Sequence, residues 1–341
     1  MRDHPQSIVG AASGLVGLLL AGAAQPTSTA AAGVVDVRYG ERLLVVAPHP
    51  DDEALGVGGL IRRVVERGGR VAVALMSAGD GYLEAVARET LSASPPPARF
   101  IAYGERRLEE VRAALDALGG GRVRLSLLGF PDAELASLLD AHWPADRPAR
   151  SPTTGCTTVP YGAALEPGAP YTGSEARRLL VRVLRLAAPS IVALPSPLDT
   201  HPDHSATGIL TLRALDEWRR DAHTVRHLPS PQLLAYLIHW PDWPPGSNAP
   251  TPGVEAASDL LLPATYPLHA HVAATLTLSD AEVDAKRVAL LRHASQQEHM
   301  PAFMAAFVRR TEPYVVLTAG DMRAAALPAT AGLPGTPQTA D

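Results

Sequence analysis

Two short segments of the chain concentrate side chains that can bind a metal ion. The first reads Pro-His-Pro-Asp-Asp-Glu over 48–53 and places His49 and Asp52 three residues apart. The second reads Asp-Thr-His-Pro-Asp-His over 199–204 and ends at His204. Crowded carboxylates are costly in a folded protein unless a cation compensates their charge. Both segments therefore predict a divalent metal held by imidazole and carboxylate groups.

The first segment alone leaves an alternative open. Asp51, Asp52 and Glu53 would also be favourable at the N-terminus of a helix, where the helix dipole stabilises negative charge without a metal. That explanation accounts for the carboxylates but not for His49, and the second segment favours the metal. Cys156 is the single cysteine, so the chain can form neither an intramolecular disulfide nor a cage of thiolates.

The elements that must position these residues follow from the hydrophobic pattern. Apolar runs of strand length alternate with segments of helical period. The runs lie at 43–47, 71–76, 123–128, 191–195 and 233–239, and the helical segments at 54–68, 104–119, 174–187, 205–220 and 279–296. This alternation predicts an α/β fold, with a Rossmann-like, mostly parallel sheet and helices on both faces. Each metal-binding segment directly follows a strand, so we expect a site at the carboxyl ends of the strands.

Local signals mark several boundaries. Gly119–Gly121 predicts the end of the second helix, and Ser279 with Glu282 predicts a capping box at the start of the last one. Residues 92–98 and 141–172 are rich in Pro, Gly, Ser and Thr and predict surface loops.

The N-terminal residues have the layout of a targeting signal. Residues 8–24 are uncharged and apolar, follow Arg2, and end in small residues. We therefore predict a signal peptide over 1–24 and a secreted, periplasmic or otherwise extracytoplasmic protein. The alternative is an uncleaved segment that anchors the protein in the membrane. We expect a spacer over 25–41, one globular domain over 42–320 and a disordered tail over 321–341.

Composition excludes some partners. The formal net charge is −5, and no run of Lys and Arg forms a stripe that could neutralise a row of phosphates. Nucleic acid is therefore not expected as a partner, and a membrane is expected only through the N-terminal segment. A small molecule or a glycan is the expected substrate, and the sequence gives no oligomeric state.

The two motifs together resemble the PIG-L/LmbE-like zinc-dependent N-deacetylases. The resemblance extends to Arg107-Leu108-Glu109-Glu110-Val111, to Gly129-Phe130-Pro131-Asp132, and to Lys286 with Ser295-Gln296, so it covers roughly residues 42–316. Members of the family usually begin the first motif with Ala-His or Ser-His, whereas this chain has Pro48-His49. The resemblance implies one zinc ion per chain, held by His49, Asp52 and His204 with a water molecule.

The resemblance also implies roles for the neighbouring residues. Asp51 would be the general base, and His201 would be an imidazolium that faces the developing oxyanion. Asp203 would be the partner that raises the pKa of His201, although His201 and Asp203 would alternatively only brace the loop that carries His204.

Substrate contacts are predicted for three further residues. Arg107 matches an arginine of the family that faces the substrate, and Asp132 matches an acidic residue of the loop after the third strand. The alternative for both is a salt bridge across the mouth of the site. Asp80 follows the second strand and is expected to bond sugar hydroxyls.

The predicted function is that of a secreted zinc-dependent hydrolase which removes the N-acetyl group from an N-acetylglucosamine-type sugar or glycoconjugate. One alternative is a zinc amidase for another acyl group or a thiol-conjugate amide. A second is a carbohydrate-binding protein that keeps the metal site without turnover. Hydrolysis of a phosphoester by two metals is a third, and it needs a bridging carboxylate and more histidine ligands.

Overall fold

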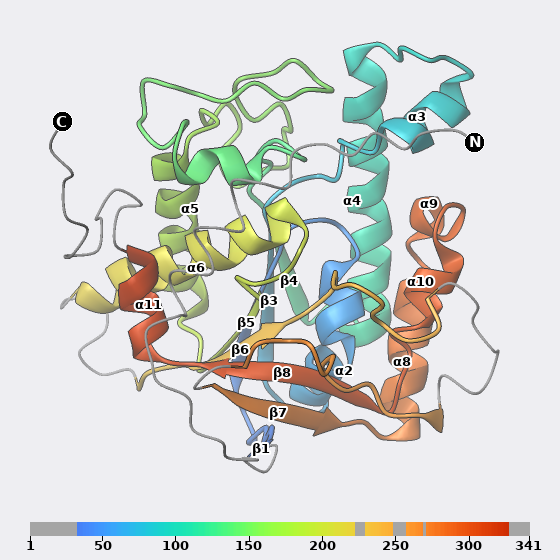
Figure 1. The fold of residues 1–341 in the computed structure, drawn as a ribbon, viewed down its shortest axis with the longest axis vertical. Coiled ribbons are helices and arrows are strands. Elements are labelled where there is room, and N and C mark those ends of the chain that lie inside the picture. The colour runs from blue at the N-terminus through green and yellow to red at the C-terminus, as the bar shows by residue number, and fades with distance from the viewer. Residues whose placement is uncertain (1–32, 222–228, 248–256, 269–270, 327–341) are drawn as a thin grey trace, which may run out of the picture.

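The chain folds around one eight-stranded sheet. The computed structural model describes residues 33–221, 229–247, 257–268 and 271–326. The strand order is β1-β7-β8-β6-β5-β2-β3-β4 (Figure 1). The strands are β1 (Gly33–Val34), β2 (Arg42–Ala47), β3 (Arg70–Leu75), β4 (Val123–Leu127), β5 (Ile191–Pro195), β6 (Gln232–Tyr236), β7 (Val272–Thr277) and β8 (Thr311–Leu317).

Five of these strands form the predicted parallel sheet. β4, β3, β2, β5 and β6 lie side by side and all run parallel, which confirms the predicted fold class. The chain builds outward from β2 in one direction through β3 and β4 and in the other through β5 and β6. The order therefore reverses between β2 and β5, and a crevice for ligands forms at such a reversal.

The remaining three strands were not predicted. β8 runs antiparallel to both β6 and β7, and β1 pairs with β7 in parallel. β8 contains Glu312 and Pro313, which interrupt its apolar pattern although nearly all of the strand is buried. β7 has only six residues, and apolar and polar residues alternate only in its second half, from Ala274 to Thr277. Neither pattern distinguishes a strand from a loop in the sequence.

The helices lie in two layers, one on each side of the sheet (Figure 1). The first layer contains α2 (Asp52–Glu66), α4 (Pro97–Gly119) and α8 (Asp280–Leu290). The second contains α5 (Gly173–Ala187), α6 (Pro202–Arg220) and α11 (Ala319–Ala326). Shorter helices are α3 (Leu83–Thr90), η1 (Leu135–Leu139), α9 (Ala294–Gln297) and α10 (Pro301–Ala305). Layers on both faces explain why β2 and β5 are almost wholly buried.

Two glycines let α2 lie close to its neighbours. A Cβ at Gly56 would lie 2.5 Å from the ring of Tyr236, and one at Gly59 would lie 2.5 Å from the side chain of Leu278. Any larger residue would push the helix away from β6 and from the segment before α8. The glycines therefore set the position of α2, whose N-terminus carries the first metal-binding motif.

Glu312 of β8 fixes the middle of α2 by hydrogen bonds. Its carboxylate accepts from the backbone amides of Gly59 and Leu60 at 2.7 and 2.9 Å. The ammonium group of Lys286 and the hydroxyl of Tyr314 complete its surroundings at 2.7 and 2.8 Å. A buried carboxylate with this many donors can be retained without a metal.

Local predictions for the helices are largely confirmed. Gly120 ends α4 with a φ of 56°, and the capping box of Ser279 and Glu282 is present at α8. α4 begins earlier than predicted, at Pro97, because a proline is well suited to the first turn of a helix. The predicted helix over 279–296 is divided, since α8 ends at Leu290 and α9 follows separately.

Both predicted boundaries of the globular domain need correction. The predicted spacer over 25–41 contains β1, followed by the buried side chains of Val35 and Val37. The predicted disordered tail begins inside α11, which packs on α6 and is held by a hydrogen bond from Arg213 to the carbonyl of Ala325. These contacts join segments far apart in the chain, so composition alone did not indicate them.

The predicted signal peptide over 1–24 lies outside the described residues, as do residues 327–341. In the part of the chain that the structure describes, no helix is long and apolar enough to cross a membrane.

Candidate metal centre and substrate cavity

The two motifs meet where the strand order reverses. β2 and β5 are adjacent and parallel, with Leu43 paired to Ile191. The turn after β2 leads into α2 and carries His49, and the turn after β5 leads into α6 and carries His204. Because the carboxyl ends of parallel strands lie at the same edge of a sheet, the two motifs meet although they are about 150 positions apart in the chain.

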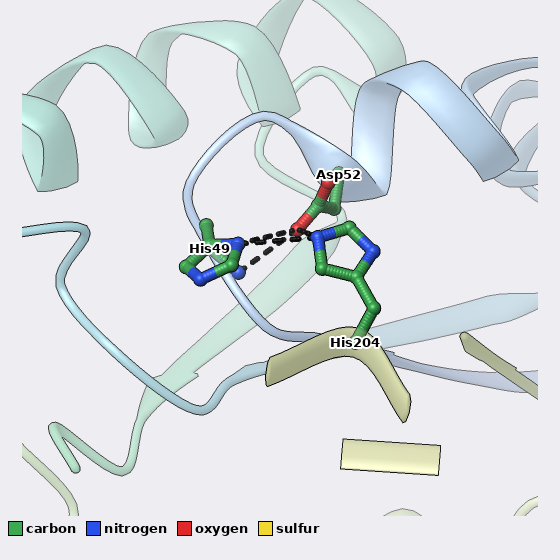
Figure 2. Close-up of side chains that lie close together, drawn as sticks. All are labelled: His49, Asp52 and His204. Atoms are coloured by element: carbon green, nitrogen blue, oxygen red, sulfur yellow. Dashed lines mark hydrogen bonds and ion pairs between the residues drawn. The ribbon is translucent and has the colours of Figure 1, made fainter. Parts of the chain in front are cut away.

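His49, Asp52 and His204 form a compact triangle of ligand atoms (Figure 2). Asp52 Oδ2 lies 3.3 Å from His49 Nδ1 and 3.3 Å from His204 Nε2. The two imidazole nitrogens are 3.2 Å apart. Two lone pairs of neutral imidazoles repel each other at this distance unless a proton or a cation lies between them. The predicted ligands are therefore in one place, and their donor set suits a divalent metal.

The second nitrogen of His49 faces two carboxylates. His49 Nε2 lies 3.2 Å from Asp132 Oδ1 and 3.3 Å from Asp203 Oδ2. These three residues are also close enough together to hold an ion. Because Nδ1 of the same ring faces Asp52, we assign the proton to Nε2, which then donates to the carboxylates. This arrangement orients the ring of His49 and leaves Nδ1 free as a ligand.

Asp203 does not have the predicted partner. Its carboxylate accepts from the backbone amides of Ala133 and Leu135 at 2.7 and 3.0 Å, in addition to facing His49. Only its backbone amide reaches His201, at 3.3 Å from Nδ1. Among the described residues, the Asp203 carboxylate therefore forms no hydrogen bond or ion pair with the ring of His201, although its charge raises the pKa of His201 as predicted. The loop after β4 lies close to α6, and its backbone amides at Ala133 and Leu135 donate to this carboxylate.

Asp199 supports His204 in the same way. Its Oδ2 lies 3.4 Å from His204 Nδ1 and accepts from the amides of Ile238 and His239, both at 3.0 Å. Its Oδ1 accepts from the amide of His201 at 2.9 Å. The sequence analysis did not single out Asp199, although it opens the second motif. The spacing of the motif could have indicated it as a second carboxylate beside an imidazole ligand.

Asp51 is held in a conformation that L-amino acids rarely adopt. Its φ is 125° and its ψ is −29° at the N-cap of α2. The buried carboxylate forms an ion pair with Arg107 Nη2 at 3.1 Å. Burial raises the pKa of Asp51 to about 7, against the opposing effect of Arg107. Strained backbone at a buried carboxylate is typical of a residue kept for function rather than stability.

The pKa of Asp52 moves in the opposite direction. Burial raises it, but the imidazoles of His204 and His49 together lower it below the usual range of a carboxyl group. The two adjacent carboxyl groups thus differ, since Asp52 is kept ionised and Asp51 can accept a proton near neutral pH.

His201 lies at the N-cap of α6 and lines the cavity. Its Nδ1 accepts from the amide of Asp203, so the proton of the neutral ring is on Nε2. Burial and the neighbouring imidazoles of His204 and His49 lower the pKa of His201 to about 4, against the opposing charges of Asp203 and Asp199. The structure therefore favours a neutral imidazole over the predicted imidazolium, because no carboxylate of the described residues forms an ion pair with its ring.

Two of the predicted metal ligands, His49 and Asp52, line a cavity of about 300 Å³. Its lining contains both polar and apolar side chains. The lining residues are His49, Asp51, Asp52, Leu55, Gly81, Tyr82, Arg107, Asp132, Ala133, His201, Ile238, His239, Gln296, Met300 and Phe303.

Two of the three predicted substrate contacts line this cavity. Arg107 and Asp132 do so, but both also have partners within the protein, Asp51 for Arg107 and the Gly81 amide for Asp132 at 2.6 Å. Asp80 is 2% exposed and accepts a hydrogen bond from Tyr161. The structure therefore gives Asp80 a buried partner in place of the predicted sugar hydroxyls.

His239 lines the cavity but was not predicted. Its ring stacks on Phe303 with 5.5 Å between centroids and 11° between planes, and lies 4.8 Å from the ring of His204. Burial lowers the pKa of His239 to about 3. His239 follows β6, so the rule that placed the two motifs at strand ends could have found it.

Comparisons with known proteins agree with this site. The family model described as PIG-L, GlcNAc-PI de-N-acetylase, matches residues 44–215, which include both motifs. A curated relative from Tsukamurella paurometabola, named 1D-myo-inositol 2-acetamido-2-deoxy-alpha-D-glucopyranoside deacetylase, is 27% identical over 75% of this chain and 82% of its own length. Diacetylchitobiose deacetylase from Thermococcus kodakarensis is 28% identical over 51% of this chain and 49% of its own length.

Solved structures also match. N,N'-diacetylchitobiose deacetylase from Pyrococcus horikoshii is 18% identical, with a TM-score of 0.47, over 94% of this chain and 96% of that one.

Proposed function

The chain belongs to the PIG-L family, and on that premise we propose that it is a zinc-dependent N-deacetylase which removes the acetyl group from an N-acetylglucosamine-type sugar or glycoconjugate. The observation that carries the proposal is the triangle of His49, Asp52 and His204, two of which, His49 and Asp52, line the cavity. The relatives from Tsukamurella and Thermococcus support it, since both are named as deacetylases of acetamido sugars.

The spacing of the three ligand atoms fits zinc. A tetrahedral ion with ligands about 2.0–2.1 Å away has ligand atoms about 3.3–3.4 Å apart. The three separations here are 3.2, 3.3 and 3.3 Å. Three protein ligands also leave one position of a tetrahedron open, as in catalytic rather than structural zinc sites. When bound, the ion would lower the pKa of a water molecule to about 7 and polarise the amide carbonyl.

Asp51 acts as the general base in this proposal. It lines the cavity beside Asp52, and Arg107 holds its carboxylate at 3.1 Å. It removes a proton from the attacking water and later gives a proton to the amine nitrogen as the C–N bond breaks. Its raised pKa, about 7, allows both transfers near neutral pH.

His201 acts as a neutral hydrogen-bond donor. Because its Nδ1 accepts from the Asp203 amide, its Nε2–H is free to donate to the oxygen that becomes negative during attack. Asp203 and Asp132 hold the ring of His49, and Asp199 holds the ring of His204. These carboxylates keep the ligands in place and do not touch the reacting amide.

The cavity suits one sugar ring. Its volume of about 300 Å³ is at the small end for ligand pockets. Among its lining residues, Arg107, Asp132 and Gln296 would offer partners for hydroxyl groups, and Leu55, Ile238 and Phe303 would contact the apolar surface of a sugar ring or an acyl group.

We further propose that the protein acts outside the cytoplasm, because residues 1–24 have the layout of a signal peptide. An extracellular polysaccharide, a cell-wall sugar or a secreted glycoside is then the natural source of the acetamido group. A fusion of residues 1–24 to a reporter protein tests this proposal. A reporter that remains in the cytoplasm would contradict it.

Release of primary amine from a panel of acetamido sugars tests the proposed activity. The panel contains N-acetylglucosamine, diacetylchitobiose and an N-acetylglucosaminyl inositol, with N-acyl sugars of longer chain for comparison. We expect turnover of at least one acetyl substrate by zinc-loaded protein, its loss after chelation, and its return with one equivalent of zinc. A preference for longer acyl chains would support the alternative amidase, and tight zinc binding without any turnover would support a binding protein.

A further inference from the structure

A buried imidazole and a buried carboxylate lie behind Asp51, outside the cavity lining. His293 is the N-cap of α9, and Glu53 is in the first turn of α2. Neither side chain is exposed, and His293 Nε2 lies 3.3 Å from Glu53 Oε1. Apart from this close approach, neither atom has a hydrogen-bond partner among the described residues, and the same is true of His293 Nδ1. The two groups are therefore each other's polar partner across 240 residues of chain.

Glu53 connects His293 to Asp51. Its other oxygen, Oε2, accepts from the backbone amide of Asp51 at 3.1 Å. This amide belongs to the residue whose φ is 125°, a conformation that local preferences oppose. Such a conformation persists only when the surroundings hold it, and the bond to Glu53 is a direct restraint on it.

The charges favour the same arrangement. Asp51, Asp52 and Glu53 are consecutive buried carboxylates, and a buried carboxylate needs donors or a cation. Arg107 contacts Asp51, but the partner at Glu53 Oε1 is His293. Burial lowers the pKa of His293, yet the Glu53 hydrogen bond and the charge of Asp51 raise it above the ordinary value.

We propose that His293 is a positioning residue for Asp51. It holds Glu53 Oε1, so that Glu53 Oε2 restrains the amide of Asp51 and directs the Asp51 carboxylate into the cavity. The inference rests on the proposed function, in which Asp51 is the general base. It assigns a role in the reaction to a histidine that lies outside both metal-binding motifs.

Substitutions of His293 separate positioning from mere packing. His293→Leu removes the donor at similar volume, and His293→Gln keeps an N–H donor without the ring. We expect His293→Leu to lower kcat by about 10–100-fold with KM changed less than about 2-fold and zinc content unchanged. His293→Gln should recover kcat to within about 5-fold of the wild type.

His271→Leu is the matched control. His271 also pairs with a carboxylate, Asp321, at 2.8 Å, but lies away from the cavity lining. We expect this variant to lower Tm without changing kcat or KM. Wild-type kcat in His293→Leu, or equal loss in His293→Gln and His293→Leu, would overturn the proposal.

Glu53→Gln tests the same connection if His293→Leu does not fold. Glutamine has one acceptor oxygen, so it can accept from the Asp51 amide or from His293 Nε2–H, but not from both. We expect a loss of kcat similar to that of His293→Leu, and no further loss in the double variant with His293→Gln, because the residues act as a unit. Additive losses would overturn the connection.

A crystal structure of zinc-loaded His293→Leu gives a result that does not depend on turnover. We expect the carboxylate of Asp51 to leave Arg107 and the φ of Asp51 to change. An unchanged turn would overturn the positioning role. If the wild type has no activity on any amide, the proposed function fails, and this structure still decides whether His293 positions Asp51.

Discussion

Glu312 and the carboxylates around His49 are both buried, but they are compensated differently. Glu312 accepts from two amides, the Lys286 ammonium and the Tyr314 hydroxyl at 2.7–2.9 Å. All of these donors belong to the fold, so the group is complete as a structural anchor for α2. It contains the only lysine in the sequence.

The carboxylates near His49 share one guanidinium group among the described residues. Asp52, Asp132 and Asp203 face His49, and the neighbouring Asp51 is the one that pairs with Arg107. Two imidazole nitrogens converge on Asp52 where a cation would fit. The difference shows that buried charge indicates function where its compensation by the fold is incomplete.

The largest effect is expected from substitution of Asp51, one of the carboxylates near His49. We expect Asp51→Asn to lower kcat about 10³-fold or more while zinc content is unchanged, because the amide cannot accept the proton. Amine release and metal analysis measure both quantities. Loss of zinc in this variant would mean that Asp51 is a ligand and not the base.

Two further variants of Asp51 test its strained backbone. Asp51→Gly and Asp51→Ala both lose the carboxylate, but only glycine adopts a φ of 125° readily. We expect the glycine variant to be more stable by about 1–3 kcal/mol in urea unfolding. Equal stability would show that the turn relaxes when the carboxylate is removed.

Lys286→Met tests the other group in the comparison, the donors around Glu312. It leaves a buried carboxylate without its cation, so we expect a loss of about 3–5 kcal/mol in the free energy of unfolding. Zinc affinity should change little in the folded protein. Arg62→Met is the control, because it breaks the exposed pair with Glu66 and should cost less than about 1 kcal/mol. Similar losses of unfolding free energy in the two variants would show that the buried pair of Lys286 and Glu312 stabilises the fold no more than the exposed pair does.

His201 is expected to have a smaller effect than Asp51. If His201 acts as a neutral hydrogen-bond donor, His201→Gln should retain activity within about 10-fold of the wild type. His201→Ala should lose about 10²-fold or more. Steady-state kinetics of the two variants measure the difference. Equal loss would favour the originally predicted imidazolium, which glutamine cannot replace.

The smallest effect is expected at the pair of His271 and Asp321, whose carboxylate and imidazole satisfy each other. The hydrogen bond that His271 donates to the Asp321 carboxylate raises the pKa of His271. Burial raises the pKa of Asp321, but the hydrogen bonds from His271 and Thr318 lower it to about 2. The stability from His271 is present below its unfolded pKa and is lost as pH rises through its raised folded pKa. That from Asp321 is lost as pH falls from about 4 to about 2.

Thermal unfolding of the wild type and His271→Gln between pH 2 and pH 9 measures this contribution. We expect the difference in Tm to be largest between about pH 4 and pH 6.5 and to decline on both sides. A difference that does not depend on pH would show that packing, rather than the ion pair, determines it.

Much of the fold and of the metal centre could be predicted from the sequence. The five parallel strands, the helix stop at Gly120, the capping box at Ser279 and the convergence of His49, Asp52 and His204 all follow from local patterns. Each pattern depends on neighbours a few residues away. Because the carboxyl ends of parallel strands share one edge of the sheet, the two metal-ligand motifs could then be expected to meet. Zinc, the acetyl substrate and export remain predictions.

The tertiary structure alone decided which polar groups pair with each other. Asp203 faces His49 instead of His201, Glu312 anchors α2, and His293 reaches Glu53. These pairs depend on the order of the strands and on how closely the helices pack. Sequence spacing fixes the direction of a side chain within its own element, but the long-range packing of elements determines what that side chain meets.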